Sequence, residues 1–243
     1  MQNFSNEELK HVDPVRLMKK EKADNIADFF LVLGVFYNDL KSFMYYSALL
    51  DETFKKVNKE KISAETGEYF GMKIHLEKLT ISTIHEFFAF IKKSKNILET
   101  QEFKSVYVRL PRYLKKQWDI LVKISINNKA QETSKFSKLF LLIRNNLGFH
   151  YDQAPKILRE GFIEHFFLKQ RDQVNEKAYY SIGEAMIDTR FFYADAAVQR
   201  SLDLQMEKIM TRKDFNLEFR QTIDAANFTI SRLLKEYLRN RPK

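Results

Sequence analysis

The sequence predicts an all-α protein, a single-domain helical bundle, and three observations support that fold class. The chain has only 6 glycines and 4 prolines in 243 residues, too few for the many turns of a β protein. Hydrophobic residues make up 44% of it, and in the predicted helices they recur at the three- and four-residue steps of one helix face. The 22 Phe and 11 Tyr residues predict an unusually aromatic core. We expect at most one short strand or irregular crossing, near residues 178–183.

After a polar lead-in over residues 1–22, the first long helix is expected from residue 23 to about residue 57. Its middle, Phe29 to Tyr37, is apolar on every face, which predicts a central helix with neighbours all round. Gly34 lies within this run. Because glycine weakens a helix interior, we interpret Gly34 as a position where a neighbouring helix approaches closely.

Six further helices are expected, over residues 68–98 and 103–126, from about residue 134, after Asp152, and over residues 187–210 and 214–238. Pro111 either kinks the helix in which it lies or opens a new first turn. Asp152 is a candidate cap, with Pro155 in the first turn that follows. Trp118, the only tryptophan, is expected in the core.

No linker or internal repeat divides the sequence, so residues 1–243 are expected to form one domain with a loose basic tail at residues 239–243. The start lacks the basic-then-apolar layout of a signal peptide, and the most apolar run is about half as long as a bilayer span requires. The absence of cysteine fits a reducing compartment. We therefore expect a cytoplasmic protein with no membrane partner.

The formal net charge of +9, from 41 Lys and Arg against 32 Asp and Glu, favours a polyanionic partner, nucleic acid first. Acidic and basic residues interleave along most of the chain, so a solvated basic surface without such a partner is the alternative. The sequence contains no Gly-rich phosphate loop, His-Glu-x-x-His pair or Gly-x-Ser-x-Gly elbow. No two of the five histidines have the helical spacing of metal ligands, and no cofactor is expected.

The segment Leu139–Asp152 is the strongest candidate for a functional site. Its apolar first half leads into an arginine, two asparagines, a histidine and a tyrosine within about two turns. On a regular helix Asn146 and His150 share a face because they are four residues apart. Arg144 lies about 120° around the helix from His150, and its long side chain can still reach the same pocket.

These residues resemble the motif of the HEPN superfamily, in which an arginine is followed by four to six residues and then a histidine. Here Arg144 is followed by the polar Asn145 and, after five intervening residues, by His150. The ten residues Ile143–Asp152 look like the form found in uncharacterised bacterial HEPN-like proteins. The resemblance implies one HEPN-like helical domain over residues 1–243, and a place among RNA-directed toxin or phage-defence proteins.

The resemblance also implies a metal-independent endoribonuclease, in which the ribose 2′-hydroxyl attacks its own phosphate to leave a 2′,3′-cyclic phosphate. Three residues then have expected catalytic roles: His150 as base or acid, Arg144 as phosphate clamp and Asn145 as a positioning group. Three more are expected to bind the substrate, namely Asn146, Phe149 and Tyr151. Family members pair two such motifs across a homodimer, and toxin members also have an antitoxin or another protein partner.

Other interpretations stay open at this point. Arg159, followed by Glu160 and then after five intervening residues by His165, matches the bare pattern a second time. We prefer Arg144 because the carboxylate after Arg159 would neutralise that arginine. Arg144 and His150 could instead cap and hydrogen-bond a buried helix end. The rival to an enzyme is a non-catalytic helical scaffold that binds a protein or RNA partner.

Overall fold

The computed structural model describes residues 12–18, 25–126, 155–168 and 177–239. Within these ranges the chain is helical and forms no sheet, which confirms the all-α class. The main helices are α2 (Asn25–Thr53), α3 (Ala64–Lys93), α6 (Arg112–Ile126), α9 (Pro155–Ile163), α10 (Phe192–Glu207) and α11 (Arg212–Arg239). The shorter ones are α1 (Pro14–Leu17), α4 (Lys95–Leu98), α5 (Gln101–Tyr107), the π-helical turn η2 (Glu164–Leu168) and the 3-10 turn η3 (Met186–Asp188).

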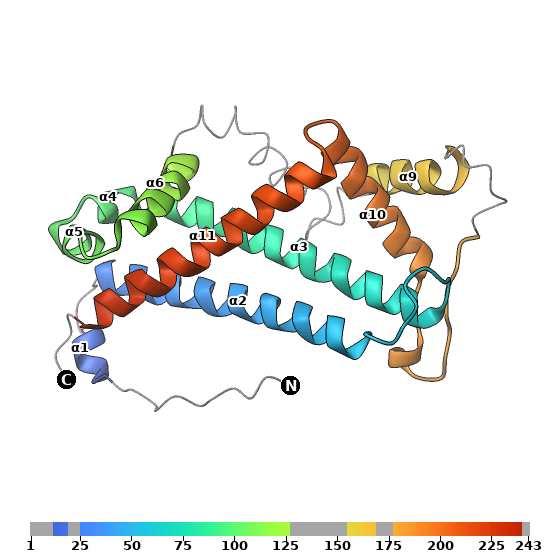
Figure 1. Ribbon diagram of the computed structural model, residues 1–243, viewed down its shortest axis with the longest axis horizontal. Helices are drawn as coiled ribbons and strands as arrows, with labels where there is room; N and C mark the ends of the chain where they lie inside the picture. The colour runs from blue at the N-terminus through green and yellow to red at the C-terminus, as the bar shows by residue number, and fades with distance from the viewer. Residues whose placement is uncertain (1–11, 19–24, 127–154, 169–176, 240–243) are drawn as a thin grey trace.

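The long helices α2 and α3 lie side by side, and α11 crosses over them (Figure 1). At one end of the bundle α4, α5 and α6 pack against this group, and at the other end α10 packs against both α3 and α9 (Figure 1). The two ends therefore differ in kind. One holds most of the apolar core, and the other holds the cavities described below.

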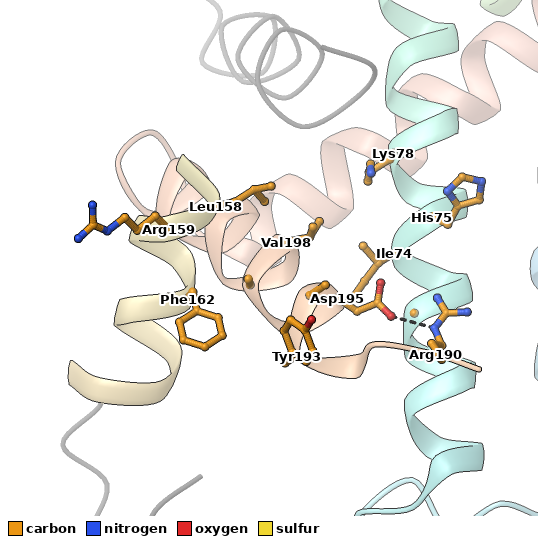
Figure 2. Close-up of a pocket in the computed structure, with 13 residues that line it drawn as sticks. Ile74, His75, Lys78, Leu158, Arg159, Phe162, Arg190, Tyr193, Asp195 and Val198 are labelled. Atoms are coloured by element: carbon orange, nitrogen blue, oxygen red, sulfur yellow. Dashed lines mark hydrogen bonds and ion pairs between the residues drawn. The ribbon is translucent and has the colours of Figure 1, made fainter. Parts of the chain in front are cut away.

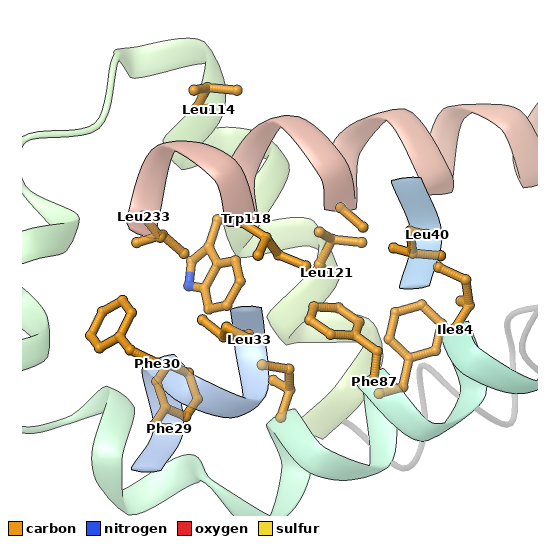
Figure 3. Close-up of a cluster of buried hydrophobic side chains, with 14 of the residues drawn as sticks. Phe29, Phe30, Leu33, Leu40, Ile84, Phe87, Leu114, Trp118, Leu121 and Leu233 are labelled. Atoms are coloured by element: carbon orange, nitrogen blue, oxygen red, sulfur yellow. The ribbon is translucent and has the colours of Figure 1, made fainter. Parts of the chain in front are cut away.

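The core lies between α2, α3, α5, α6 and α11 and is built largely from aromatic rings (Figure 3). Phe30 of α2 stacks on Tyr237 of α11, with ring centroids 4.0 Å apart and planes 12° from parallel. Phe29 stacks in the same way on Phe90, at 5.3 Å. Trp118 of α6 is 2% exposed, so its expected place in the core is confirmed. Such stacked pairs add to the free energy that comes from burying the rings themselves.

Local sequence signals explain where several helices begin and end. The hydroxyl of Ser63 accepts a hydrogen bond from the backbone N–H of Thr66 at 3.1 Å and so caps α3. This cap starts α3 four residues before the expected position, residue 68. Pro111 opens a new helix rather than kinking one, because α5 ends at Tyr107 and the Pro111 carbonyl accepts from Lys115 as α6 begins.

The interpretation of α2 as a helix surrounded by neighbours is wrong. Phe29, Phe30 and Leu33 are buried, but Leu31 and Val35 on the opposite side are 59% and 55% exposed. The interpretation of Gly34 is wrong for the same reason, since a Cβ placed there would meet no atom of another group within 4 Å. Gly34 is half-buried and lines a cavity between α2 and α11 with Leu234 and Leu238, so α11 faces it without approaching closely.

Other expected bounds differ from the structure: the helix expected over residues 68–98 breaks at Ser94 into α3 and α4, and the one expected over residues 187–210 is α10, Phe192–Glu207. Residues 178–183 are extended and form one isolated bridge, between Ser181 and Arg190. The helix expected from residue 134 and the cap expected at Asp152 lie outside the described residues, although α9 does begin at Pro155. None of the helices in the described ranges combines the length and apolar composition that crossing a bilayer requires.

Candidate functional site: two adjacent cavities at the α9–α10 end

All six residues of the predicted catalytic and substrate-binding set lie in residues 127–154, outside the described part of the chain: Arg144, Asn145, Asn146, Phe149, His150 and Tyr151. Their assignment stays a prediction. The segment that directly follows them, α9 with η2, is described, and it forms one wall of two neighbouring cavities.

The structure does not bring Arg159 and His165, the second match to the motif, into one cavity. Arg159 of α9 lines the cavity between α3, α9 and α10, which we call the α3–α10 cavity. His165 of η2 lines a different one, which we call the basic-aromatic pocket. The guanidinium of Arg159 points away from the neighbouring helices (Figure 2). Arg159 and His165 therefore do not share a site among the described cavities.

The basic-aromatic pocket has a volume of about 530 Å³ and is assembled from segments far apart in the sequence. The α2–α3 loop contributes Lys59 and Lys61, and the extended segment before η3 contributes Lys177. Together with His165 of η2, these three lysines face a single carboxylate in the described lining, that of Glu60. The pocket therefore has an excess of positive charge.

Hydrogen bonds and a ring contact fix the loop that carries two of these lysines. The Asn58 side chain accepts from the backbone N–H of Glu60 at 3.0 Å, and the Asn58 carbonyl accepts from the Thr66 hydroxyl at 3.3 Å. The ammonium of Lys59 lies 4.2 Å from the centroid of the Tyr69 ring, a cation–π contact. Lys59 and its neighbours are thus held in place on the pocket's edge.

Aromatic side chains form much of the rest of the pocket wall, namely Phe70, Phe166, Tyr179, Phe192 and Tyr193. Two of them leave much of their surface to solvent, Phe70 at 46% and Tyr179 at 43%. The ring of Phe192 lies so close to α3 that a Cβ at Gly67 would overlap it. A larger residue at position 67 would therefore clash, because Phe192 packs directly on the backbone of α3 at Gly67.

Arg190 anchors the segment that carries Lys177 and Tyr179. Its Nε donates to Asp195 of α10 at 2.8 Å, and its Nη1 donates to Glu68 of α3 at 2.7 Å. Burial alone would lower the pKa of Arg190, but the hydrogen bonds and charges of the two carboxylates raise it. The backbone N–H of Tyr193 also donates to the Tyr179 carbonyl at 3.0 Å. The segment is thus tied to both helices.

The α3–α10 cavity is the larger of the two, at about 700 Å³, and Tyr193 lines both. Its wall on α3 carries Ile74, His75 and Lys78 (Figure 2). Burial lowers the pKa of His75, and the positive charges of Lys78 and Arg190 lower it further, against a partial opposite effect of Asp195. His75 thus lies among charges of both signs, with Lys78 and Arg190 on one side of the balance and Asp195 on the other.

Comparison with family models, with curated proteins and with solved structures finds no match to this chain. Within the described ranges no three His, Asp or Glu side chains are grouped so that they could hold a metal ion.

The sequence did not predict the residues of these cavities. Lys61, Phe70, Lys177 and Phe192 are spread over more than a hundred positions, and no spacing rule connects them. The run Ala178–Gly183 was the one usable signal, because two adjacent tyrosines in an irregular segment favour exposed rings.

Proposed function

We propose that this chain binds single-stranded RNA in the basic-aromatic pocket. The observation that carries the proposal is the convergence of Lys59, Lys61, Lys177 and His165 on a pocket whose walls are five aromatic side chains. Proteins hold single strands by tracking the phosphates with positive charge while bases stack on aromatic rings. Unpaired RNA bases are free to stack in this way, whereas bases within a duplex are not.

We further propose that the bound RNA is cleaved by the HEPN-like motif, with Arg144, Asn145 and His150 in the roles that the resemblance implies. Covalent geometry supports this. His150 is five residues before Pro155, the first residue of α9, and an extended chain covers at most about 3.6 Å per residue, so their Cα atoms lie within about 18 Å of each other. Leu158 and Phe162 of α9 line the α3–α10 cavity. The motif thus directly precedes α9 in the chain, and η2, which continues α9, contributes His165 to the proposed RNA site.

The chemistry needs only what this motif contains. A histidine titrates near neutral pH and can take the proton of the attacking 2′-hydroxyl. A guanidinium offers two aligned donors to a phosphate whose oxygens gain negative charge in the transition state. A homodimer would supply a second histidine to protonate the leaving 5′-oxygen. We assign the protein to RNA-directed toxin or phage-defence systems on the same basis.

The binding test uses a fluorescent single-stranded RNA of about ten nucleotides, a length within the usual range for such sites. Lys61→Gln and Lys177→Gln should each weaken binding, and each should reduce the slope of log affinity against log salt by about 0.7, the value for one phosphate contact on a single strand. Tyr179→Ala should cost about 1 to 3 kcal/mol, the usual effect of losing one stacked base. Lys93→Gln, which changes the same charge at the far end of α3, is the matched control. Equal affinities for Lys61→Gln, Lys177→Gln and Lys93→Gln would show that RNA does not use this pocket.

The cleavage test measures the rate at which the protein degrades single-stranded RNA in the presence of EDTA. Products should carry 2′,3′-cyclic phosphate, and DNA should stay intact because it lacks the attacking 2′-hydroxyl. His150→Ala should lower the rate by about two to four orders of magnitude, and Arg144→Ala by a similar factor. At saturating RNA, His165→Ala should leave the rate nearly unchanged. If wild type binds RNA but neither it nor His150→Ala cleaves it, the chain is a non-catalytic scaffold.

A further inference from the structure

The outer side of α2 carries a second stripe of residues, opposite the one that faces the core. Its members follow one another at alternating steps of four and three positions: Leu31, Val35, Asn38, Ser42, Tyr45 and Leu49. At about 100° per residue they all fall within about 40° of one line along the helix, and the buried Leu33 and Leu40 lie on the other side. This alternation is the a and d repeat by which two helices pack against each other.

The stripe is exposed and uncharged. Its four apolar members are each between 44% and 59% exposed, although charged residues make up 30% of the whole chain. The charged residues of α2 within its length, Asp39 and Lys41, lie on its two flanks, where the polar rim of an interface is expected. Asn38 and Ser42 lie at its centre, and a polar residue in such a repeat fixes the register of the pair.

The apolar area of this face is sufficient for a homodimer. Tyr46 lies beside the stripe, and Leu238 of α11 borders its N-terminal half; both side chains are about half exposed. Because one aromatic side chain carries about 150 to 250 Å² of surface, six half-exposed side chains of this kind offer roughly 500 to 600 Å². A homodimer of standard size buries about 800 Å² per partner, of which about 65% is apolar. The two apolar areas agree.

The two halves of the stripe differ in shape. The N-terminal half borders a cavity of about 280 Å³ between α2 and α11, and Leu31 and Val35 line this cavity with Leu238. The C-terminal half carries the exposed rings of Tyr45 and Tyr46. In an antiparallel pair the tyrosines of each copy meet the cavity of the other copy. A parallel pair would place rings against rings and leave both cavities empty.

We propose that a second copy of this chain packs on this face, with its α2 antiparallel to that of the first. A two-fold contact uses the same patch on both copies, and the stripe is symmetric about position 40. This register places three pairs of residues opposite each other: Leu31 with Leu49, Val35 with Tyr45 and Asn38 with Ser42. The proposed cleavage chemistry also calls for a homodimer, but the evidence for this surface does not rest on it.

The first test is sedimentation at micromolar concentration, where wild type should be a dimer. Val35→Glu places an unpaired charge in the contact and should raise the dissociation constant of the dimer about a hundredfold or more. Ile120→Glu on α6 is the matched control, because Ile120 is equally exposed, at 58%, outside the stripe. Helical circular dichroism equal to that of wild type shows that both variants fold. A monomeric wild type would overturn the proposal, as would equal shifts in the two variants.

The second test uses cross-linking, since the chain contains no cysteine. A disulfide needs Cα atoms within about 7 Å of each other. A mixture of Leu31→Cys and Leu49→Cys should therefore form a disulfide between chains. Either variant alone should not, because its two cysteines would lie about 27 Å apart along the antiparallel pair. Neither test uses RNA, so both are independent of the RNA pocket. Absence of a disulfide in the mixture would overturn the contact, and disulfides in each variant alone would overturn the antiparallel pairing.

Discussion

At the scale of single residues, the α9–α10 end of the molecule depends on a few charged side chains whose partners lie far away in the sequence. Arg190 and Glu68 are 122 residues apart, yet their ion pair holds the extended segment on α3. No local pattern marks Arg190 as different from other arginines of this basic chain. A pairing of this kind comes from the path of the whole chain, which is why the sequence did not predict it.

His75 provides a prediction at this scale. Because its pKa is lower in the folded than in the unfolded chain, the unfolded chain takes up the proton first as the pH falls below about 6.5. His75 therefore adds no pH dependence to stability above that pH, and it destabilises the fold as the pH falls from there through the folded pKa. We expect His75→Gln to unfold at a higher urea concentration, relative to wild type, at pH 5.5 than at pH 7.5. The groups that face His75 are Lys78, Arg190 and Asp195. An equal difference at the two pH values would contradict the assignment.

At the scale of helices, the sequence predicted where helices run better than which side of them is buried. The apolar run Phe29 to Tyr37 forms a helix as expected, but a pattern that is apolar on every face does not say where neighbours lie. The structure buries Phe29, Phe30 and Leu33 and exposes Leu31 and Val35. The close approach that we expected at Gly34 instead occurs at Gly161, where α9 meets α10.

These two glycines give a matched prediction. A Cβ at Gly34 would meet nothing within 4 Å, so Gly34→Ala should raise the free energy of unfolding by about 1 kcal/mol, the helix preference of alanine over glycine. A Cβ at Gly161 would overlap the Ser201 hydroxyl and the Ala197 carbonyl. That hydroxyl also donates to the Ile157 carbonyl at 2.9 Å and so joins α9 to α10. Gly161→Ala should therefore lower the free energy of unfolding by about 1 to 3 kcal/mol, the usual cost of overpacking. Urea unfolding of both variants measures the difference, and shifts of the same sign would contradict this account of the packing.

At the scale of the whole molecule, the fold class followed from composition and periodicity, because low glycine content and helical spacing are properties of the entire chain. The cavities did not follow, because Lys61, Phe70, Lys177 and Phe192 meet only when α2, α3 and α10 have packed. The catalytic assignment rests on ten consecutive residues that lie outside the described part of the chain. It stays a prediction for experiment.

The family resemblance also predicts the assembly state. One histidine cannot easily serve both proton transfers of RNA cleavage, so we expect a homodimer with the helix over residues 139–152 at or beside the interface. Sedimentation at micromolar concentration should give about twice the chain mass of 29.0 kDa. A strict monomer in the absence of any partner would count against a composite site.

Trp118 gives the molecule a built-in optical reporter. It is the only tryptophan in the chain, and its ring is in contact distance of Phe103, with centroids 5.9 Å apart. It lies on α6, at the opposite end of the bundle from α9 and α10 (Figure 1). Its emission therefore follows the hydration of the aromatic core, while the tyrosines of the two cavities contribute little to it. Selective excitation of Trp118 at long wavelength therefore reports unfolding of the aromatic core separately from ligand binding in the cavities. No added label is needed.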